Sequence, residues 1–316
     1  MHQRQLGRSG IAISPLVFGG NVFGWTADRA RSFDLLDRFL GAGFETVDTA
    51  DVYSAWVPGN AGGESETIIG DWMAARGNRD AVTIVTKVGM EMGPEEKGLS
   101  ATWIERAAEA SLRRLKTDRI DLYLSHLHDE SVPYEETLSA YDRLIRAGKV
   151  RAIGASNHSA EQLRAALDVS SATGLPRYEV LQPEFNLHNR AGYEGALSDL
   201  ARAEGISTIT YYSLASGFLT GKYRSAADLG QSPRGAGIKA YLTPRGLRIL
   251  DALEAVAGAH GAKPAEVALA WLIARPDVTA PIASATSTEQ LDSLIRATTL
   301  QLGAEDIAAL DQASRA

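Results

Sequence analysis

Four side chains that can hold or transfer a proton stand at the ends of apolar, strand-like stretches of the sequence. They are Asp48 and Tyr53 in TVDTADVYSAW, Lys87 in VTIVTKV, and His126 in IDLYLSH. A carboxylate and a lysine tolerate burial together, whereas burial of either group alone is costly. A lysine ammonium beside a phenol favours the phenolate, so we expect it to lower the pKa of Tyr53 from about 10. If the four groups meet, they form a tuned general acid, with His126 able to orient a carbonyl oxygen toward the phenol.

Each of these residues also has an ordinary structural explanation when it is taken alone. A single lysine at a strand end is usually a solvated side chain, and a single tyrosine usually packs with its hydroxyl in water. His158 and His188 have no evident partner, so we interpret them as structural. We interpret Asp51 as a residue that orients its loop. The chemical interpretation therefore requires a fold that brings the ends of separate strands together.

Short β-rich runs alternate with segments of helical periodicity from one end of the chain to the other, without a linker rich in Pro, Ser or Gly. Eight strands, each followed by a helix, predict an α/β fold, the (β/α)8 (TIM) barrel, in which residues 1–316 form one domain. An open doubly wound sheet is the structural alternative, but the segment FGGNVFGW after the first strand does not match GxGxxG. RQLGRSGIAIS predicts a β-hairpin that would cap the bottom of the barrel. The eight expected strands are 15–20, 46–50, 82–88, 120–126, 150–156, 179–185, 207–213 and 280–286.

Two of the expected helices show their periodicity clearly. In ARSFDLLDRFLGAG, Phe33, Leu36 and Leu40 recur at helical spacing before two glycines. In LSATWIERAAEASLRRL, Ser100 is the expected N-cap. Both helices would pack their apolar faces against the barrel.

Composition excludes several classes of function. Of the 316 residues 45% are hydrophobic, the net charge is -7, and the basic residues are scattered, so we expect no nucleic-acid partner. Cysteine is absent, which removes thiolate metal sites and a cysteine nucleophile, and we expect no metal site. The start lacks the apolar core of a signal peptide and no run is long enough to cross a membrane, so we expect a cytoplasmic protein without a membrane partner. The sequence sets no expectation for the oligomeric state.

In a barrel of this kind, functional residues gather at the carboxyl ends of the strands. Every expected strand from the second onward ends in polar side chains, and the motifs around them resemble the aldo-keto reductase superfamily over nearly the whole chain. The resemblance implies an eight-stranded barrel that binds a nicotinamide cofactor, usually NADPH, without a separate nucleotide domain. The motifs that carry it are LGRSGIAISPLVFG, ETVDTADVYS with SETIIG, IVTKVG, LRRLKTDRIDLYLSH, GKVRAIGASN, LQPEFN, YYSLASGFLTGKY and PIASATSTEQL.

The resemblance also implies the chemistry. Its catalytic residues correspond to Asp48, Tyr53, Lys87 and His126, with hydride transferred from C4 of the nicotinamide to an aldehyde or ketone. Tyr53 would donate the proton to the carbonyl oxygen, Lys87 and Asp48 would tune it, and His126 would orient the substrate. The expected activity is therefore NAD(P)H-dependent reduction of a small carbonyl substrate to an alcohol.

A further set of residues is expected to hold the cofactor. By the resemblance, Ser156, Asn157 and Gln182 bind the nicotinamide carboxamide, and Tyr211 stacks on the ring. The segment SLASGFLTGK would wrap the pyrophosphate, since barrels commonly bind phosphate in the loops after strands seven and eight. Thr286 and Glu289 have the spacing of a capping box, which would turn a helix N-terminus toward the adenosine. The expected set is completed by Ser213, Leu214, Gly217, Leu219, Lys222, Ser284, Thr286, Ser287 and Gln290.

The sequence departs from the family pattern in one place. Many relatives have an arginine or lysine just after strand eight that pairs with the 2′-phosphate of NADPH, but the stretch 276–295 contains no basic residue. Thr286 and Ser287 can donate hydrogen bonds without a charge. NADH is therefore possible in place of NADPH, as is a basic residue contributed from elsewhere.

Aromatic residues at the expected rim are candidates for the substrate pocket. Trp25 follows the first strand and Trp56 follows the Tyr53 motif, and we expect both to form apolar walls around the carbonyl substrate. The glycine-rich segments 57–63 and 226–237 are candidates for closing over cofactor or substrate.

Two other functions are compatible with parts of the sequence. Barrels often place a reactive lysine at a strand end, so a Schiff-base aldolase acting through Lys87 is one alternative. The other is a nucleotide-binding regulatory subunit, because some relatives, such as potassium-channel β subunits, keep the fold and the nucleotide while serving a partner. Those relatives tend to lose the strand-four histidine, whereas His126 is present here.

Overall fold

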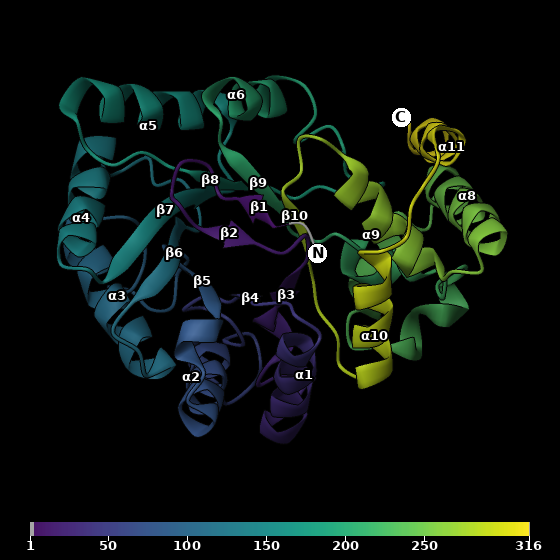
Figure 1. Ribbon diagram of the computed structural model, residues 1–316, viewed down its shortest axis with the longest axis horizontal. Helices are drawn as coiled ribbons and strands as arrows, with labels where there is room; N and C mark the ends of the chain where they lie inside the picture. Colours follow the sequence, from purple (N-terminus) through teal and green to yellow (C-terminus); the bar gives the residue numbers. More distant parts are fainter. Residues whose placement is uncertain (1–2, 316) are drawn as a thin grey trace.

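Eight parallel strands close into a barrel in the computed structural model, which describes residues 3–315 (Figure 1). The order around the barrel follows the chain, with the last strand hydrogen-bonded to the first. The predicted (β/α)8 barrel is confirmed, and most strands end a few residues earlier than predicted. The strands are β3 (Val17–Gly19), β4 (Thr46–Asp48), β5 (Thr83–Val88), β6 (Ile120–Ser125), β7 (Val150–Ser156), β8 (Val180–Gln182), β9 (Ser207–Thr210) and β10 (Ala280–Ala283).

Helices surround the barrel. Helices α8 and α11 pack against each other on one side, away from the barrel strands (Figure 1). The helices are α1 (Arg29–Gly41), α2 (Glu64–Arg76), α3 (Ala101–Leu115), α4 (Tyr134–Arg146), α5 (Ala160–Thr173), α6 (Ala196–Glu204), α7 (Gly235–Ile238), α8 (Pro244–His260), α9 (Pro264–Ala274), α10 (Thr288–Ala297) and α11 (Ala304–Ser314). Short 3-10 turns are η1 (Gly20–Val22), η2 (Arg79–Ala81), η3 (Ala215–Thr220), η4 (Ala226–Gln231) and η5 (Lys239–Tyr241).

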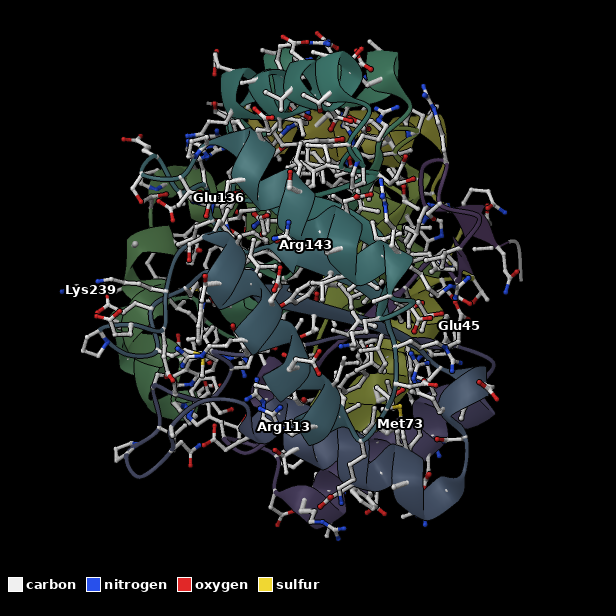
Figure 2. All side chains as sticks on the ribbon, turned by 90° about the vertical axis from the view of Figure 1, so that its left-hand side faces the viewer. Glu45, Met73, Arg113, Glu136, Arg143 and Lys239 are labelled. Atoms are coloured by element: carbon white, nitrogen blue, oxygen red, sulfur yellow. The ribbon has the colours of Figure 1, made fainter. Side chains whose placement is uncertain are left out.

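The apolar core has two layers because successive side chains of a strand point to opposite faces. In β6, Leu122 and Leu124 pack in the barrel interior, while Tyr123 packs outward among the helices. Charged residues cover the outside of the helical layer, as Arg113 and Arg143 show on α3 and α4 (Figure 2). No helix within residues 3–315 is both long and apolar enough to cross a membrane.

An N-terminal hairpin of β1 (Arg4–Gln5) and β2 (Ala12–Ile13) closes one end of the barrel, as predicted. Its apolar residues Leu6, Ile11 and Ile13 are buried in the interior layer. The Gly7 amide donates to Oγ of Ser207 at 2.8 Å, and Ser207 is the first residue of β9. The hairpin therefore covers the amino ends of the strands and leaves the carboxyl ends open.

The helix predictions are confirmed with one change. Ser100 caps α3, its Oγ accepting a hydrogen bond from the Trp103 amide at 3.3 Å. In α1, however, Leu35 and Phe39 are fully buried beside Leu36, whereas Phe33 is only partly buried. The guanidinium of Arg29 packs over the Phe33 ring, 4.4 Å from the ring centroid.

Helix α2 approaches the end of α3 so closely that only a glycine fits at the contact. A Cβ at Gly70 would collide with the carbonyl oxygen of Arg114 and would lie 2.6 Å from the carbonyl carbon of Leu115. A Cβ at Gly258, in the last turns of α8, would meet no atom within 4 Å. Both glycines lie in helices, but only Gly70 lacks the space for a methyl group.

We predict opposite effects when each of these glycines is replaced by alanine. Gly70→Ala should lower the free energy of unfolding by about 1–3 kcal/mol, because backbone atoms must shift to admit the methyl group. Gly258→Ala should raise it by about 0.5–1 kcal/mol, because alanine is the better helix former. Urea unfolding followed by circular dichroism measures both, and equal effects of the two substitutions would contradict this packing of α2 on α3.

Candidate active site

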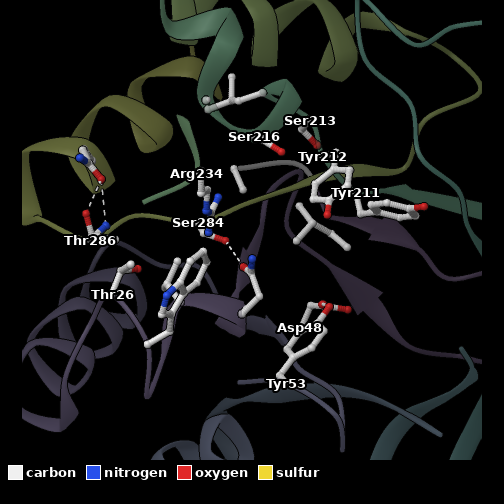
Figure 3. A pocket seen from close by; sticks show the side chains of 18 of the residues that line it. Thr26, Asp48, Tyr53, Tyr211, Tyr212, Ser213, Ser216, Arg234, Ser284 and Thr286 are labelled. Atoms are coloured by element: carbon white, nitrogen blue, oxygen red, sulfur yellow. Dashed lines mark hydrogen bonds between the residues drawn. The ribbon is translucent and has the colours of Figure 1, made fainter. Parts of the chain in front are cut away.

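A cavity of about 1160 Å³ opens at the carboxyl ends of the strands (Figure 3). Its walls come from the loops that follow several strands, and nearly all the predicted site residues lie in them. Lys87 lies behind the wall, fully buried. The predicted residues that line the cavity are Trp25, Asp48, Tyr53, Trp56, His126, Ser156, Asn157, Gln182, Tyr211, Ser213, Leu214, Gly217, Lys222, Ser284, Thr286, Ser287 and Gln290.

Asp48, Lys87 and Tyr53 form a closed hydrogen-bonded group at the floor of this cavity. The Lys87 ammonium donates to Asp48 Oδ1 at 2.7 Å, to the Tyr53 hydroxyl at 2.8 Å and to the Thr49 carbonyl at 2.8 Å. The Tyr53 hydroxyl donates to Asp48 Oδ1 at 3.1 Å. An ammonium group has three donors, so Lys87 uses all of them within the protein.

Parallel pairing of the strands puts these groups together. Asp48 is the last residue of β4 and Lys87 the last but one of β5, on the adjacent strand. The loop after β4 continues by one turn, with the Asp51 amide donating to the Lys87 carbonyl, and this turn returns Tyr53 over the ammonium. The Lys87 nitrogen lies 4.5 Å from the centroid of the Tyr53 ring.

The expectation that the pKa of Tyr53 lies below about 10 is wrong. Burial and the neighbouring Asp48 carboxylate raise the pKa of Tyr53 well above 10. Burial also lowers the pKa of Lys87, although Asp48 acts in the opposite direction. Removal of water from the phenolate outweighs the attraction of the ammonium, whose charge is already shared with Asp48. Tyr53 therefore keeps its proton at neutral and moderately alkaline pH.

His126 follows β6 directly and faces the cavity beside Tyr53. The two ring centroids are 6.1 Å apart. Burial, and then the charge of Lys87, lowers the pKa of His126 well below 6.5, so the imidazole is neutral at pH 7. Its Nδ1 is buried and has no hydrogen-bond partner among residues 3–315, which favours the tautomer with the proton on Nε2.

Three residues predicted to hold the carboxamide share one hydrogen-bond network with Tyr211. The Tyr211 hydroxyl donates to Asn157 Oδ1 at 2.6 Å, and Asn157 Nδ2 donates to the His126 carbonyl at 3.0 Å. Ser156 Oγ donates to the Gln182 carbonyl at 2.9 Å. Asn157 has a φ of 55°, the left-handed conformation that asparagine tolerates, and this turns its amide back toward the cavity.

The segment after β9 is a 3-10 turn with a break in the middle. Ser216 and Gly217 have φ values of 58° and 99°, and a Cβ on Gly217 would meet no atom within 4 Å. Ser213, Leu214 and Gly217 line the cavity as predicted. Leu219 does not, because the turn points its side chain into the apolar core, where it is fully buried.

The predicted capping box of Thr286 and Glu289 is wrong by one residue. The N-cap of α10 is Ser287, whose Oγ accepts from the Gln290 amide at 3.2 Å. The Thr286 amide and hydroxyl both donate to Gln290 Oε1, at 2.9 and 3.1 Å. The helix N-terminus still faces the cavity, as predicted, with Thr286, Ser287 and Gln290 around it.

Two basic residues that the sequence reasoning missed also line the cavity. Arg234 lies over the Trp25 ring, 5.1 Å from its centroid, and projects into the same cavity as Ser284 (Figure 3). Arg234 Nη2 is buried and has no hydrogen-bond partner among the described residues. Lys263 lies at the N-terminus of α9, with its ammonium 3.3 Å from Glu289 Oε1. The signal for Arg234 is its position in the segment 226–237, a candidate for closing over cofactor or substrate.

Trp25 and Trp56 meet edge to face at one side of the cavity. Their ring centroids are 5.8 Å apart, and Trp56 is also 6.1 Å from the Tyr53 ring. Trp56 is 48% exposed, an unusual amount for so large an apolar side chain. The two indoles form an apolar wall of the cavity, with Trp56 next to the Tyr53 ring.

Two more buried polar residues, His158 and Asp51, lie near the site. His158 is buried, its Nδ1 2.8 Å from the Ser156 carbonyl oxygen, and burial lowers its pKa to about 4. The interpretation of Asp51 as orienting its loop is not supported, since neither carboxyl oxygen has a hydrogen-bond partner in residues 3–315. Burial, and then Glu66, raises the pKa of Asp51 well above 3.8. Within the same residues no group of His, Cys, Asp or Glu is arranged to hold a metal ion.

The sequence of this chain is similar to those of several known proteins. A family model described as "Aldo/keto reductase family" matches residues 15–315. The Bacillus subtilis (strain 168) protein named "Uncharacterized oxidoreductase YrpG" is 34% identical over 313 residues, which cover 96% of this chain and 93% of the relative. The L-glyceraldehyde 3-phosphate reductase of Escherichia coli O157:H7 is 31% identical over 327 residues, covering 99% and 92%. A probable voltage-gated potassium channel subunit beta of Oryza sativa subsp. japonica is 34% identical over 301 residues, covering 92% and 89%.

Proposed function

The chain belongs to the aldo/keto reductase family, and on this basis we propose that it reduces an aldehyde or ketone to the alcohol with a nicotinamide cofactor, NADPH in preference to NADH. It is an oxidoreductase, and members of its family generally use NADP(H) or NAD(H). The observation that carries the proposal is the hydrogen-bonded group of Asp48, Lys87 and Tyr53 at the cavity floor. We also propose that residues 1–316 form one catalytic domain, since the family match extends from residue 15 to 315.

The residues around the cavity fit a nicotinamide dinucleotide. Arg234 presents a buried nitrogen without a partner among residues 3–315, which suits a phosphate oxygen. The break in η3 at Gly217 leaves open space beside the backbone, and the N-terminus of α10 suits a second anionic group. Ser156, Asn157 and Gln182 would hold the carboxamide, and Tyr211 would lie against the ring. When bound, the cofactor supplies a hydride from C4 to the carbonyl carbon.

Tyr53 supplies the proton that the reduced carbonyl oxygen requires. Its raised pKa keeps the hydroxyl protonated, and rotation about its C–O bond turns the hydrogen from Asp48 Oδ1 toward the cavity. After the transfer, Lys87 stabilises the phenolate, because it already donates a hydrogen bond to that oxygen. Asp48 keeps Lys87 in its ammonium form against the cost of burial.

His126 orients the substrate as a neutral hydrogen-bond donor. With Nδ1 buried and unpartnered among the described residues, the Nε2 proton is free to point into the cavity at the carbonyl oxygen. Trp25 and Trp56 exclude water from one side of this position and present an apolar surface to the substituent on the carbonyl. The donors of His126 and Tyr53 would then both converge on one oxygen atom.

The preference for NADPH follows from cations that come from outside the stretch 276–295. Lys222, Arg234 and Lys263 all line the cavity. Lys263 is partly neutralised by Glu289, whereas the buried Nη2 atom of Arg234 has no partner among the described residues. A phosphate at that nitrogen would replace a lost hydration shell with a charge-assisted hydrogen bond.

The alternative functions account for fewer of these contacts. In a Schiff-base aldolase the lysine must be free to attack, but all three donors of Lys87 are engaged and its side chain is fully buried. Identity alone does not separate an enzyme from a regulatory subunit, since relatives with both kinds of name match equally well. The complete set of Asp48, Tyr53, Lys87 and His126 around one cavity favours catalysis.

We predict that Tyr53→Phe removes most of the carbonyl reduction while nucleotide binding survives. Loss of a general acid should lower the rate by about 10² or more. The rate is measured as the loss of NADPH absorbance with each member of a panel of aldehydes and ketones as substrate. Nucleotide binding is measured as quenching of tryptophan fluorescence. Tyr134→Phe is the matched control, because the Tyr134 hydroxyl contacts His128 and does not line the cavity. A Tyr53→Phe variant with the wild-type rate would refute the assignment.

We predict that Arg234→Gln weakens NADPH binding by about 10- to 100-fold, because a charge-assisted hydrogen bond to phosphate is lost. Lys239→Gln removes the same charge from an exposed position in the next turn, η5, and we expect it to leave the dissociation constant nearly unchanged. Fluorescence titration measures both variants. Equal affinities of wild type and Arg234→Gln would show that Arg234 does not hold the cofactor.

A further inference from the structure

The two carboxyl oxygens of Asp48 have different partners. Oδ1 accepts from Lys87 at 2.7 Å and from Tyr53 at 3.1 Å. Oδ2 accepts from Nε2 of Gln182 at 2.8 Å, across the barrel from β4 to β8. Asp48 and Gln182 are each only 2% exposed. One carboxylate therefore connects the proton-donating group to a residue of the expected carboxamide site.

The charge of Asp48 fixes which way the Gln182 amide faces. A carboxylate only accepts hydrogen bonds, so the NH2 group of Gln182 must point at it. The side-chain oxygen, Oε1, then faces the cavity, which Gln182 lines. Among residues 3–315 this oxygen accepts no hydrogen bond, although it is not sealed from the cavity. The backbone of Gln182 is held as well, since its carbonyl accepts from Ser156 Oγ.

We propose that Asp48 is also a positioning residue for the cofactor. Through Gln182 it presents a hydrogen-bond acceptor at the place where the nicotinamide carboxamide binds, and so selects the NH2 group of that carboxamide. This inference rests on the proposed function, because it requires a nicotinamide cofactor. It goes beyond it by giving the carboxylate that keeps Lys87 charged a second task, which is to fix how the nicotinamide ring is held.

Asp48→Asn tests the link because it replaces a carboxylate by a group with one acceptor and one donor. The oxygen of the introduced amide must face the Lys87 ammonium, so its NH2 group must face Gln182. Gln182 then turns over and presents NH2 to the cavity in place of oxygen. The overall shape is unchanged, but the carboxamide site then presents a hydrogen-bond donor in place of an acceptor.

The probe is a pair of nucleotides that differ only at this group. NADP⁺ carries the carboxamide, whereas 3-acetylpyridine adenine dinucleotide phosphate carries a methyl ketone, which accepts hydrogen bonds and donates none. Wild-type protein should bind NADP⁺ about 10-fold more tightly than the analogue, because the analogue leaves Gln182 Oε1 unpaired. Dissociation constants are measured by tryptophan fluorescence without turnover, so the readout does not depend on catalysis.

Four proteins, the wild type and three variants, complete the experiment. In Asp48→Asn the preference should nearly disappear, since the Gln182 NH2 group can donate to either carbonyl. In Gln182→Met, which has similar volume and no amide, the preference should disappear as well. Tyr53→Phe is the matched control: it disables the proton donor without touching Gln182, and the preference of about 10-fold should remain. Circular dichroism and urea unfolding check that each variant is folded.

The outcomes separate this inference from the proposed function. If wild-type protein binds neither NADP⁺ nor NAD⁺, the proposed function fails and the inference fails with it. If wild-type protein binds the nucleotides but Asp48→Asn or Gln182→Met keeps the wild-type preference, only the inference is overturned. Gln182→Met tests the inference independently if Asp48→Asn does not fold. If the chain binds NAD⁺ more tightly, the corresponding pair without the 2′-phosphate is used.

Discussion

The site depends on one constraint, which is that a lysine ammonium is buried completely inside the protein. Lys87 has no exposed side-chain surface, so each of its three donors requires an acceptor of the protein itself. Asp48, Thr49 and Tyr53 provide those acceptors. The loop after β4 is thereby bound to the end of β5, and Tyr53 cannot leave the ammonium without leaving a buried donor unpaired. The position of the proton donor follows from the cost of burying a charge.

The same burial decides the protonation states around the cavity. Desolvation raises the pKa of Tyr53 and lowers the pKa of His126, so both groups are uncharged and able to donate a hydrogen bond at neutral pH. Asp48 and Lys87 remain a compensated ion pair behind them. The cavity thus offers two neutral hydrogen-bond donors, Tyr53 being backed by the Lys87 ammonium, which suits a carbonyl oxygen that gains negative charge during reduction. In the same cavity, partly buried Arg234 suits a phosphate.

Much of this arrangement could be predicted from the sequence, because it follows from the order of strands. The eight strands, the hairpin and the convergence of Asp48, Lys87 and His126 at one rim all depend on local patterns and on the rule that function gathers at carboxyl ends. The direction of the Tyr53 pKa shift could not be predicted, since it depends on how completely water is removed. Arg234 was missed because a cation in an irregular segment has no periodicity. The capping box at Thr286 and the burial of Leu219 show that local patterns do not fix side-chain direction in short turns.

The central claim is that Tyr53 acts as a general acid whose proton is held by burial beside Asp48 and Lys87. The most direct measurement is the pH dependence of kcat/KM for carbonyl reduction, with the nucleotide saturating. A pKa well above 10 predicts a rate that is constant from about pH 6 to 9 and falls only above about pH 10. A decline with a midpoint below about pH 8 would contradict the account, because it would show that the ammonium of Lys87 lowers the pKa of the phenol.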